Sequence, residues 1–160
     1  KGVVVVAAAG NDSYSGTAPL ASHLPAALPK VIGVSGTNFA GTRSCFSNLG
    51  DVAAPAGNGL PGVDKNGDPQ NCWPAVAQCT GDCQTALISL VDRVGKGYAY
   101  WTGTSFATPL VSGVSALVMD QGVSPPDWVP PGDVQVAIKC AAAAHGGIID
   151  VPDTLGACMP

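Results

Sequence analysis

A short stretch around residue 105 combines a reactive side chain with a backbone shape that can present it. Residues 103–109 read G-T-S-F-A-T-P, and an apolar helix is expected over residues 104–121. Gly103 and the small Thr104 permit a sharp turn that brings the Ser105 hydroxyl to the surface. Unpaired N–H groups and the positive dipole end of a helix start favour an oxyanion beside it. The stretch therefore predicts a nucleophilic serine, although a Gly-Thr-Ser triplet can also be a simple helix N-cap.

A second stretch could supply a hydrogen-bond donor for that oxyanion. Residues 3–9 are a continuous run of valine and alanine that ends at Gly10 and Asn11. Such a run is typical of a buried, central strand in a parallel sheet, and we expect a strand over residues 2–9. An amide N–H of Asn11 aimed at a tetrahedral intermediate would stabilise its negative oxygen. The alternative is a turn asparagine that bonds its own loop.

Several motifs in order resemble the subtilisin-like serine proteases. Between the A-A-G-N strand end and the G-T-S segment lie a Pro-rich loop with a V-I-x-V strand at 28–34, an F-S-x-x-G turn at 44–50 and a D-V-x-A-P strand at 51–57. A G-G-x-I-D segment at 146–150 follows. The resemblance implies an α/β, subtilisin-like three-layer fold with a mostly parallel sheet and helices on both faces. It makes Ser105 the nucleophile, and Asn11 and the Ser105 N–H the oxyanion donors.

The resemblance also implies contacts with a peptide or protein substrate. One wall of the pocket for the residue before the scissile bond would be formed by Ala8, Ala9 and Gly10. The segment before the nucleophile would lie on the leaving-group side, and it comprises Trp101, Thr102, Gly103 and Thr104.

The base that should activate Ser105 is missing. In the family the chain order is Asp, then His, then Ser, so both partners should precede Asn11, and only ten residues do. His23 and His145 follow Asn11 and lack a helix-start setting, so we expect both to be solvated loop residues. Residues 1–160 are thus predicted to be the C-terminal part of one secreted endopeptidase domain, inactive until a complementary N-terminal half supplies Asp and His. The alternative is a non-catalytic fragment that serves as a binding or structural module, alone or with its own copy.

Composition fits one globular domain. The chain has 160 residues, is 46% hydrophobic and only 11% charged, and has a net charge of −4. No basic patch favours a nucleic-acid partner, and no run of about twenty apolar residues predicts a membrane span. Further strands are expected at 31–36, 51–54, 97–102 and 148–150, and a second helix at 133–143. Residues 58–96 depart most from the family pattern and are interpreted as a long Cys-containing loop insertion, within which 84–91 is a strand or short helix.

Six cysteines indicate an oxidising, extracellular compartment. We expect Cys140 to pair with Cys158. Two of Cys72, Cys79 and Cys83 would pair with each other, and the third with Cys45. A zinc site is the alternative, because three residues separate Cys79 from Cys83, but no histidine lies nearby.

Two stretches are candidates for structural calcium, and no cofactor is required. Asp64, Asn66 and Asp68 place oxygens at alternating positions, as calcium loops do, but the later glutamate is missing and a plain turn is the alternative. By resemblance to the family, a weak cation would be held by Asp51 with carbonyls of a Pro-rich loop, where Leu49 replaces a second acid. Those carbonyls belong to Ala26, Leu28 and Val31. The Leu24–Pro25 step in the same loop is a candidate cis bond.

Overall fold

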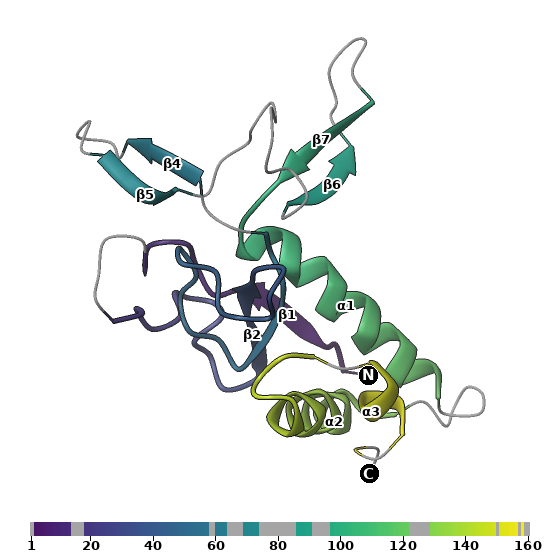
Figure 1. Cartoon of the computed structure of the whole chain (residues 1–160). Helices are drawn as coiled ribbons and strands as arrows, with labels where there is room; N and C mark the ends of the chain where they lie inside the picture. Colours follow the sequence, from purple (N-terminus) through teal and green to yellow (C-terminus); the bar gives the residue numbers. More distant parts are fainter. Residues whose placement is uncertain are drawn as a thin grey trace.

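The computed structural model describes residues 2–13, 18–57, 60–63, 69–73, 86–90, 97–121, 129–149, 151–156 and 158. It is an α/β domain in which a three-stranded parallel sheet packs against helices (Figure 1). The sheet has the order β1-β2-β3, formed by β1 (Val5–Ala8), β2 (Val31–Thr37) and β3 (Val52–Pro55). The helices are α1 (Thr104–Asp120), α2 (Pro131–Ala144) and α3 (Val151–Leu155).

Two antiparallel hairpins lie beyond the end of the molecule where α1 begins (Figure 1). One pairs β4 (Leu60–Val63) with β5 (Pro69–Trp73), and the other pairs β6 (Leu87–Leu90) with β7 (Tyr98–Trp101). Three of these strands fall within the proposed insertion at 58–96, so residues 84–91 contain a strand and not a helix. The second hairpin leads directly into α1, and thereby into the serine turn.

Alternation along β2 explains how the sheet is covered. Ile32 and Val34 are fully buried and belong to one apolar cluster with residues of α1 and α2. Gly33 and Ser35 face the other way, toward loops: a Cβ built on Gly33 would lie 2.9 Å from the Ala26 carbonyl oxygen, and Ser35 Oγ donates to the Asn48 carbonyl. In the described part of the chain, helices therefore cover one face of β2 and loops cover the other. The expected second helical layer is not formed by these residues.

The first strand differs from its prediction. It is shorter than residues 2–9, and within the described residues it pairs only with β2, so it is an edge strand and not a central one. Val5 is 44% exposed and Val3 is 79% exposed. The apolar sequence of this strand suits coverage on both sides, but the described residues cover only one side.

The C-terminal region follows the prediction with shifted boundaries. Helix α2 begins at Pro131, two residues before its predicted start, because proline is well suited to a first helical position, where no N–H partner is needed. Within the predicted strand at 148–150, Ile148 forms a single parallel bridge with Ala53, and residue 150 lies outside the described residues. Helix α3 was not anticipated. The Cys140–Cys158 disulfide is confirmed, as is the cis bond at Leu24–Pro25.

Several predictions fall outside the described residues. Among the cysteines, Cys45 is disulfide-bonded, while Cys79, Cys83 and the side chain of Cys72 are not described. The calcium candidates Asp64, Asn66 and Asp68 also lie outside the described residues. In the part of the chain that is described, no helix combines the length and apolarity that a bilayer crossing requires.

Candidate active site

The turn before α1 presents Ser105 at the surface. Gly103 is the N-cap of α1, with a φ of 133° that residues with a Cβ rarely adopt. Its N–H donates to the Ala56 carbonyl at 2.9 Å, which fastens the turn to the segment after β3. Ser105 is the second residue of α1 and is exposed, whereas Thr104 beside it is fully buried. Two consecutive residues therefore differ in exposure: Thr104 is buried, and Ser105 lies at the surface.

Asn11 lies directly against this turn. Its amide oxygen accepts the Thr104 N–H at 2.9 Å and the Thr104 hydroxyl at 3.0 Å. Because the oxygen accepts both hydrogen bonds from Thr104, the amide nitrogen lies on the opposite side of the amide group, away from these two donors. A Cβ built on Gly103 would lie 3.4 Å from that nitrogen, and Asn11 Nδ2 donates to no described residue. The arrangement brings a side-chain donor group beside the residue that precedes Ser105.

Gly10 completes the contact between the two stretches. Its N–H donates to Thr104 Oγ1 at 3.3 Å, so the Thr104 hydroxyl joins Gly10 to Asn11. Gly10 has a φ of 113°, and a Cβ on it would lie only 2.6 Å from Asn48 Nδ2. Both facts require glycine here.

Ala8 and Ala9 lead into this turn from β1. Ala8 is the last residue of β1 and pairs with Val34. Ala9 is fully buried, and its N–H donates to the Val34 carbonyl at 2.9 Å. The two alanines are thus anchored to the centre of the sheet, and they hold the Gly10–Asn11 turn at its edge.

Trp101, at the end of β7, packs beside the turn that carries Ser105. Its ring stacks on Phe106 with centroids 5.1 Å apart. The indole Nε1 is buried and has no acceptor among the described residues. Thr102, which follows it, makes polar contacts of its own. Trp101 therefore packs its ring against the first turn of α1 and keeps its indole N–H enclosed.

The two histidines lie where solvated residues were expected. His23 is exposed in a loop, and its Nε2 is 3.5 Å from Asp12 Oδ2. His145 is an exposed turn residue that follows α2. Neither is held in a buried, oriented position of the kind a general base needs.

Hydrogen-bond donors already lie at the predicted weak cation site, and binding of a cation there stays a prediction. Asp51 Oδ1 is 3.2 Å from Lys139 Nζ, and Asp51 Oδ2 accepts the Gly33 N–H at 2.9 Å. The Val31 carbonyl accepts the Gln135 amide at 3.3 Å, and the Leu28 carbonyl accepts the Val31 N–H at 3.0 Å. Three of the four predicted ligands, Asp51, Val31 and Leu28, therefore already accept hydrogen bonds. Asp51, the only carboxylate among the four, also pairs with the Lys139 ammonium.

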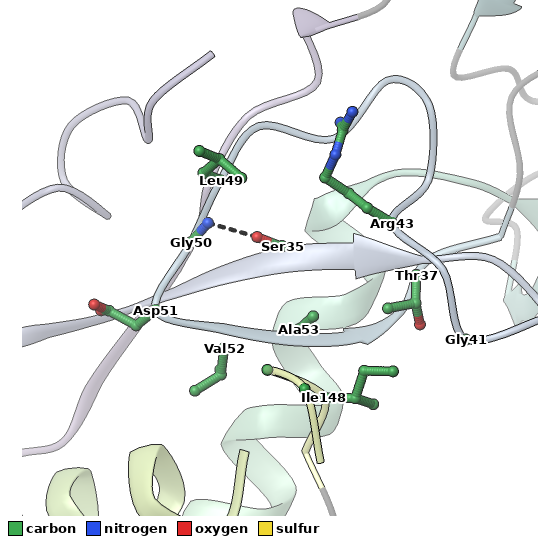
Figure 2. A pocket seen from close by; sticks show the side chains of 12 residues that line it. Ser35, Thr37, Gly41, Arg43, Leu49, Gly50, Asp51, Val52, Ala53 and Ile148 are labelled. Carbon is green, nitrogen blue, oxygen red and sulfur yellow. Dashed lines mark hydrogen bonds between the residues drawn. The ribbon is translucent and has the colours of Figure 1, made fainter. Parts of the chain in front are cut away.

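Asp51 also borders a pocket between β2, β3 and the turn that joins them (Figure 2). The pocket has a volume of about 250 Å³ and is also lined by Gly146, Gly147 and Ile148. Figure 2 shows Arg43 and Asp51 well apart on its rim, and the Arg43 guanidinium bonds the Ser44 and Ser47 carbonyls. None of the predicted catalytic residues lines this pocket. Among the described residues, no group of three or more His, Cys, Asp or Glu side chains could hold a metal ion.

The sequence matches the model of the subtilase family over residues 1–150. The chain belongs to the subtilase family. Among curated relatives, this subtilase is 33% identical over 150 residues to an extracellular protease of Xanthomonas campestris pv. campestris, covering 92% of the chain and 21% of that protein. It is 33% identical over 131 residues to a subtilisin of Bacillus pumilus, covering 79% of the chain and 35% of that protein. The chain thus spans about a third or less of the length of these relatives.

Solved structures give the same relationship. The self-cleaved protease domain of PatA is 27% identical, with a TM-score of 0.61 over 98% of this subtilase chain and 50% of that domain. The prenylagaramide maturation protease PagA is 23% identical, with a TM-score of 0.66 over 99% of this chain and 51% of that one, which is evidence for the fold alone. The chain corresponds to about half of each structure.

One residue close to Asn11 was not predicted to matter. Asn48 is a fully buried amide in the F-S-x-x-G turn, and it hydrogen-bonds the turn that carries Asn11. The residue type alone did not reveal this contact, since most asparagines in turns bond their own loop.

Proposed function

We propose that this chain is the C-terminal part of a secreted subtilase endopeptidase that cleaves peptide bonds through an acyl-enzyme on Ser105. Ser105 Oγ attacks the carbonyl carbon while a histidine of the N-terminal half takes its proton and an aspartate orients that histidine. The Asn11 amide and the Ser105 N–H donate to the oxyanion. The intermediate collapses, the C–N bond breaks, and the histidine returns the proton to the leaving amine. Water then hydrolyses the ester.

The orientation of Asn11 is the observation that carries this proposal. Its oxygen is occupied by two donors from Thr104, so its N–H groups are turned away from the buried hydroxyl and have no described acceptor. Donors fixed before reaction need no reorganisation when charge develops, which is why such groups contribute strongly to catalysis. A turn asparagine that served only its own loop would not reach across 93 positions of sequence to a helix start.

The open edge of β1 supports a complementary N-terminal half as partner. Two cavities flank the start of this strand, of about 390 Å³ and 580 Å³. Residues of α2 border the first and residues of α1 border the second. Both are lined by Val3, Val4 and Val5. An unpaired strand edge with apolar hollows on both sides fits a further strand and the helices that accompany it.

The substrate is proposed to be a peptide or protein chain and the location extracellular. The Cys140–Cys158 disulfide supports an oxidising compartment. The Xanthomonas relative is itself described as an extracellular protease. Within the proposed pocket wall, Ala8 and Gly10 carry no bulky side chain, so a substrate backbone can approach them closely, whereas Ala9 is itself fully buried.

Active-site labelling tests the proposal. In the full-length protein, a fluorophosphonate should label Ser105, and Ser105→Ala should abolish both labelling and peptide hydrolysis. Asn11→Ala should lower kcat by about 10²–10³, the loss known for the equivalent asparagine of subtilisin, a member of this family. Full activity in Ser105→Ala would disprove the acyl-enzyme.

Labelling of the isolated 160-residue chain distinguishes the protease function from the alternative of a non-catalytic binding module. Without the base this chain should remain unlabelled, and adding the N-terminal half should restore labelling. If the full-length protein also stays unlabelled while the chain folds, the alternative of a non-catalytic binding module is favoured.

A further inference from the structure

A single buried side chain holds both flanks of the Asn11 turn. Asn48 is fully buried, and its Oδ1 accepts the Asp12 N–H at 3.1 Å and the Ser13 hydroxyl at 2.8 Å. Its Nδ2 donates to the Ala9 carbonyl at 3.4 Å. These partners precede and follow Asn11 in the chain, so one amide links the two ends of the turn.

Backbone contacts of Asn48 reinforce the same turn. The Asn48 N–H donates to the Gly10 carbonyl at 3.0 Å, and the Phe46 carbonyl accepts the Ser13 N–H at 3.1 Å. A Cβ on Gly10 would lie 2.6 Å from Asn48 Nδ2, so the amide packs directly against the Gly10 backbone. The turn therefore cannot shift relative to Asn48 without breaking several bonds at once.

The identity of the partners indicates that Asn48 does more than find the hydrogen bonds that any buried amide needs. A buried asparagine needs partners wherever it sits. Here all the described partners of the Asn48 side chain belong to the turn around Asn11, and none belongs to the loop that carries Asn48. The Asn11 side chain is held by Thr104, while the Asn11 backbone is held through its neighbours by Asn48.

We propose that Asn48 is a positioning residue that sets the place of the Asn11 amide, and with it the oxyanion donor; this rests on the proposed function. Asn48 does not touch substrate. It fixes the backbone from which the Asn11 side chain extends, and Thr104 then fixes the orientation of the amide. Transition-state contacts are sensitive to small displacements, and a shift of about 1 Å can lower the rate by about 10²-fold.

The test compares kcat and KM in the full-length protein. Asn48→Ala should lower kcat by about tenfold or more, with KM within about twofold of wild type, because a transition-state contact is lost and ground-state binding is not. In an Asn11→Ala background the same substitution should change kcat by no more than about twofold, because the donor it positions is gone. The core variant Val134→Ala serves as control: it should lower Tm without changing kcat per active site, since Val134 is fully buried in α2.

A milder variant covers the case in which Asn48→Ala does not fold. Ser13→Ala removes the hydroxyl that donates to Asn48 Oδ1 and accepts the Leu20 N–H. It should lower kcat in the same direction, by about threefold, and again only while Asn11 is present.

Each outcome separates this inference from the proposed function. If wild type is labelled at Ser105 and Asn48→Ala keeps full kcat, or loses as much kcat in the Asn11→Ala background as in wild type, the positioning role is wrong and the protease function stands. When Asn48→Ala does not fold, an unchanged kcat in Ser13→Ala likewise contradicts the role. If wild type has no peptidase activity, both proposals fall together.

Discussion

At the scale of single residues, Thr104 connects the two halves of the candidate site. Its N–H and hydroxyl both donate to Asn11, and its hydroxyl accepts from Gly10. Its carbonyl also accepts the Thr108 hydroxyl at 2.8 Å, within the first turn of α1. Since Thr104 is fully buried, these groups have no water to replace their partners. The sequence placed Thr104 only among the residues near substrate, whereas the structure gives it an orienting contact.

The first prediction at this scale concerns the Thr104 hydroxyl. Thr104→Val keeps the shape of the side chain but removes one bond to Asn11 and leaves the Gly10 N–H without an acceptor. We expect kcat to fall by about tenfold. The free energy of unfolding should fall by about 1–3 kcal/mol, the cost of an unsatisfied buried group. Peptide hydrolysis and urea unfolding of the full-length protein measure the two effects.

Thr104→Ser is the matched control, because it keeps the hydroxyl and loses only a methyl group. It should retain most of the activity. Equal losses in the serine and valine variants would mean that packing, and not hydrogen bonding, explains the effect.

Residue types predicted a chemistry for the site but not the residues that support it. Ser105 and Asn11 were predicted because a serine on a helix-start turn and an asparagine after a buried strand each suit one chemical task. Asn48 could not be found in the same way, because its role depends on contacts with residues more than thirty positions away. Hydrogen bonds over such separations are set by the packed fold and leave no local sequence pattern.

At the scale of elements, α2 contributes polar side chains where the family resemblance implied a cation. Gln135 and Lys139 are four residues apart and so share one face of the helix. From that face Gln135 reaches the Pro29 and Val31 carbonyls, and Lys139 reaches Asp51. The predicted ligands lie in a loop and at a strand start, and α2 places the Gln135 amide and the Lys139 ammonium beside them.

A substitution in α2 tests this replacement. Lys139→Met should lower Tm by at most about 3 °C, because a half-exposed ion pair contributes only about 0–1 kcal/mol. In the variant, Asp51 has lost its counter-charge, so added calcium chloride should raise Tm more than it does in wild type. Differential scanning calorimetry measures both shifts.

Lys30→Met provides the control, because Lys30 is exposed and has no carboxylate partner among the described residues. Its response to calcium should equal that of wild type. An equal response in Lys139→Met would contradict the idea that the ammonium occupies the cation position.

Element boundaries were predicted best where the pattern was strong. The short apolar stretch at 31–36 predicted β2, and the wide apolar stripe after Ser105 predicted α1, each to within one residue of its end. The helix α3 was missed because five residues containing a proline carry no clear periodicity. The edge position of β1 was missed because an apolar run reports burial and does not report which chain segment provides it.

At the scale of the whole molecule, one edge of β1 pairs with none of the described residues. Exposed apolar side chains lie on β1 and on α1, including Val5, Leu110 and Leu117. An edge of this kind invites pairing with any available strand. In the isolated chain we therefore expect self-association, and in the complete domain we expect the edge to be covered.

A charge on the edge strand tests this expectation. Val5→Lys in the isolated chain should shift the molecular mass measured by light scattering toward that of the monomer, because a lysine disfavours strand pairing at an edge. In the full-length protein the same substitution should instead lower Tm, since the charge becomes buried.

Val136→Lys adds the same charge on the exposed surface of α2, where Val136 is 60% exposed. It should leave the mass of the isolated chain unchanged. Monomeric wild-type chain would show that β1 does not attract a partner strand.

The contact between Asn11 and Thr104 joins positions 93 residues apart. During synthesis, the amide leaves the ribosome long before the helix start that orients it. The corner that we propose to hold the oxyanion can therefore form only after Thr104 has emerged, so the proposed nucleophile would become reactive only once the surrounding fold is in place.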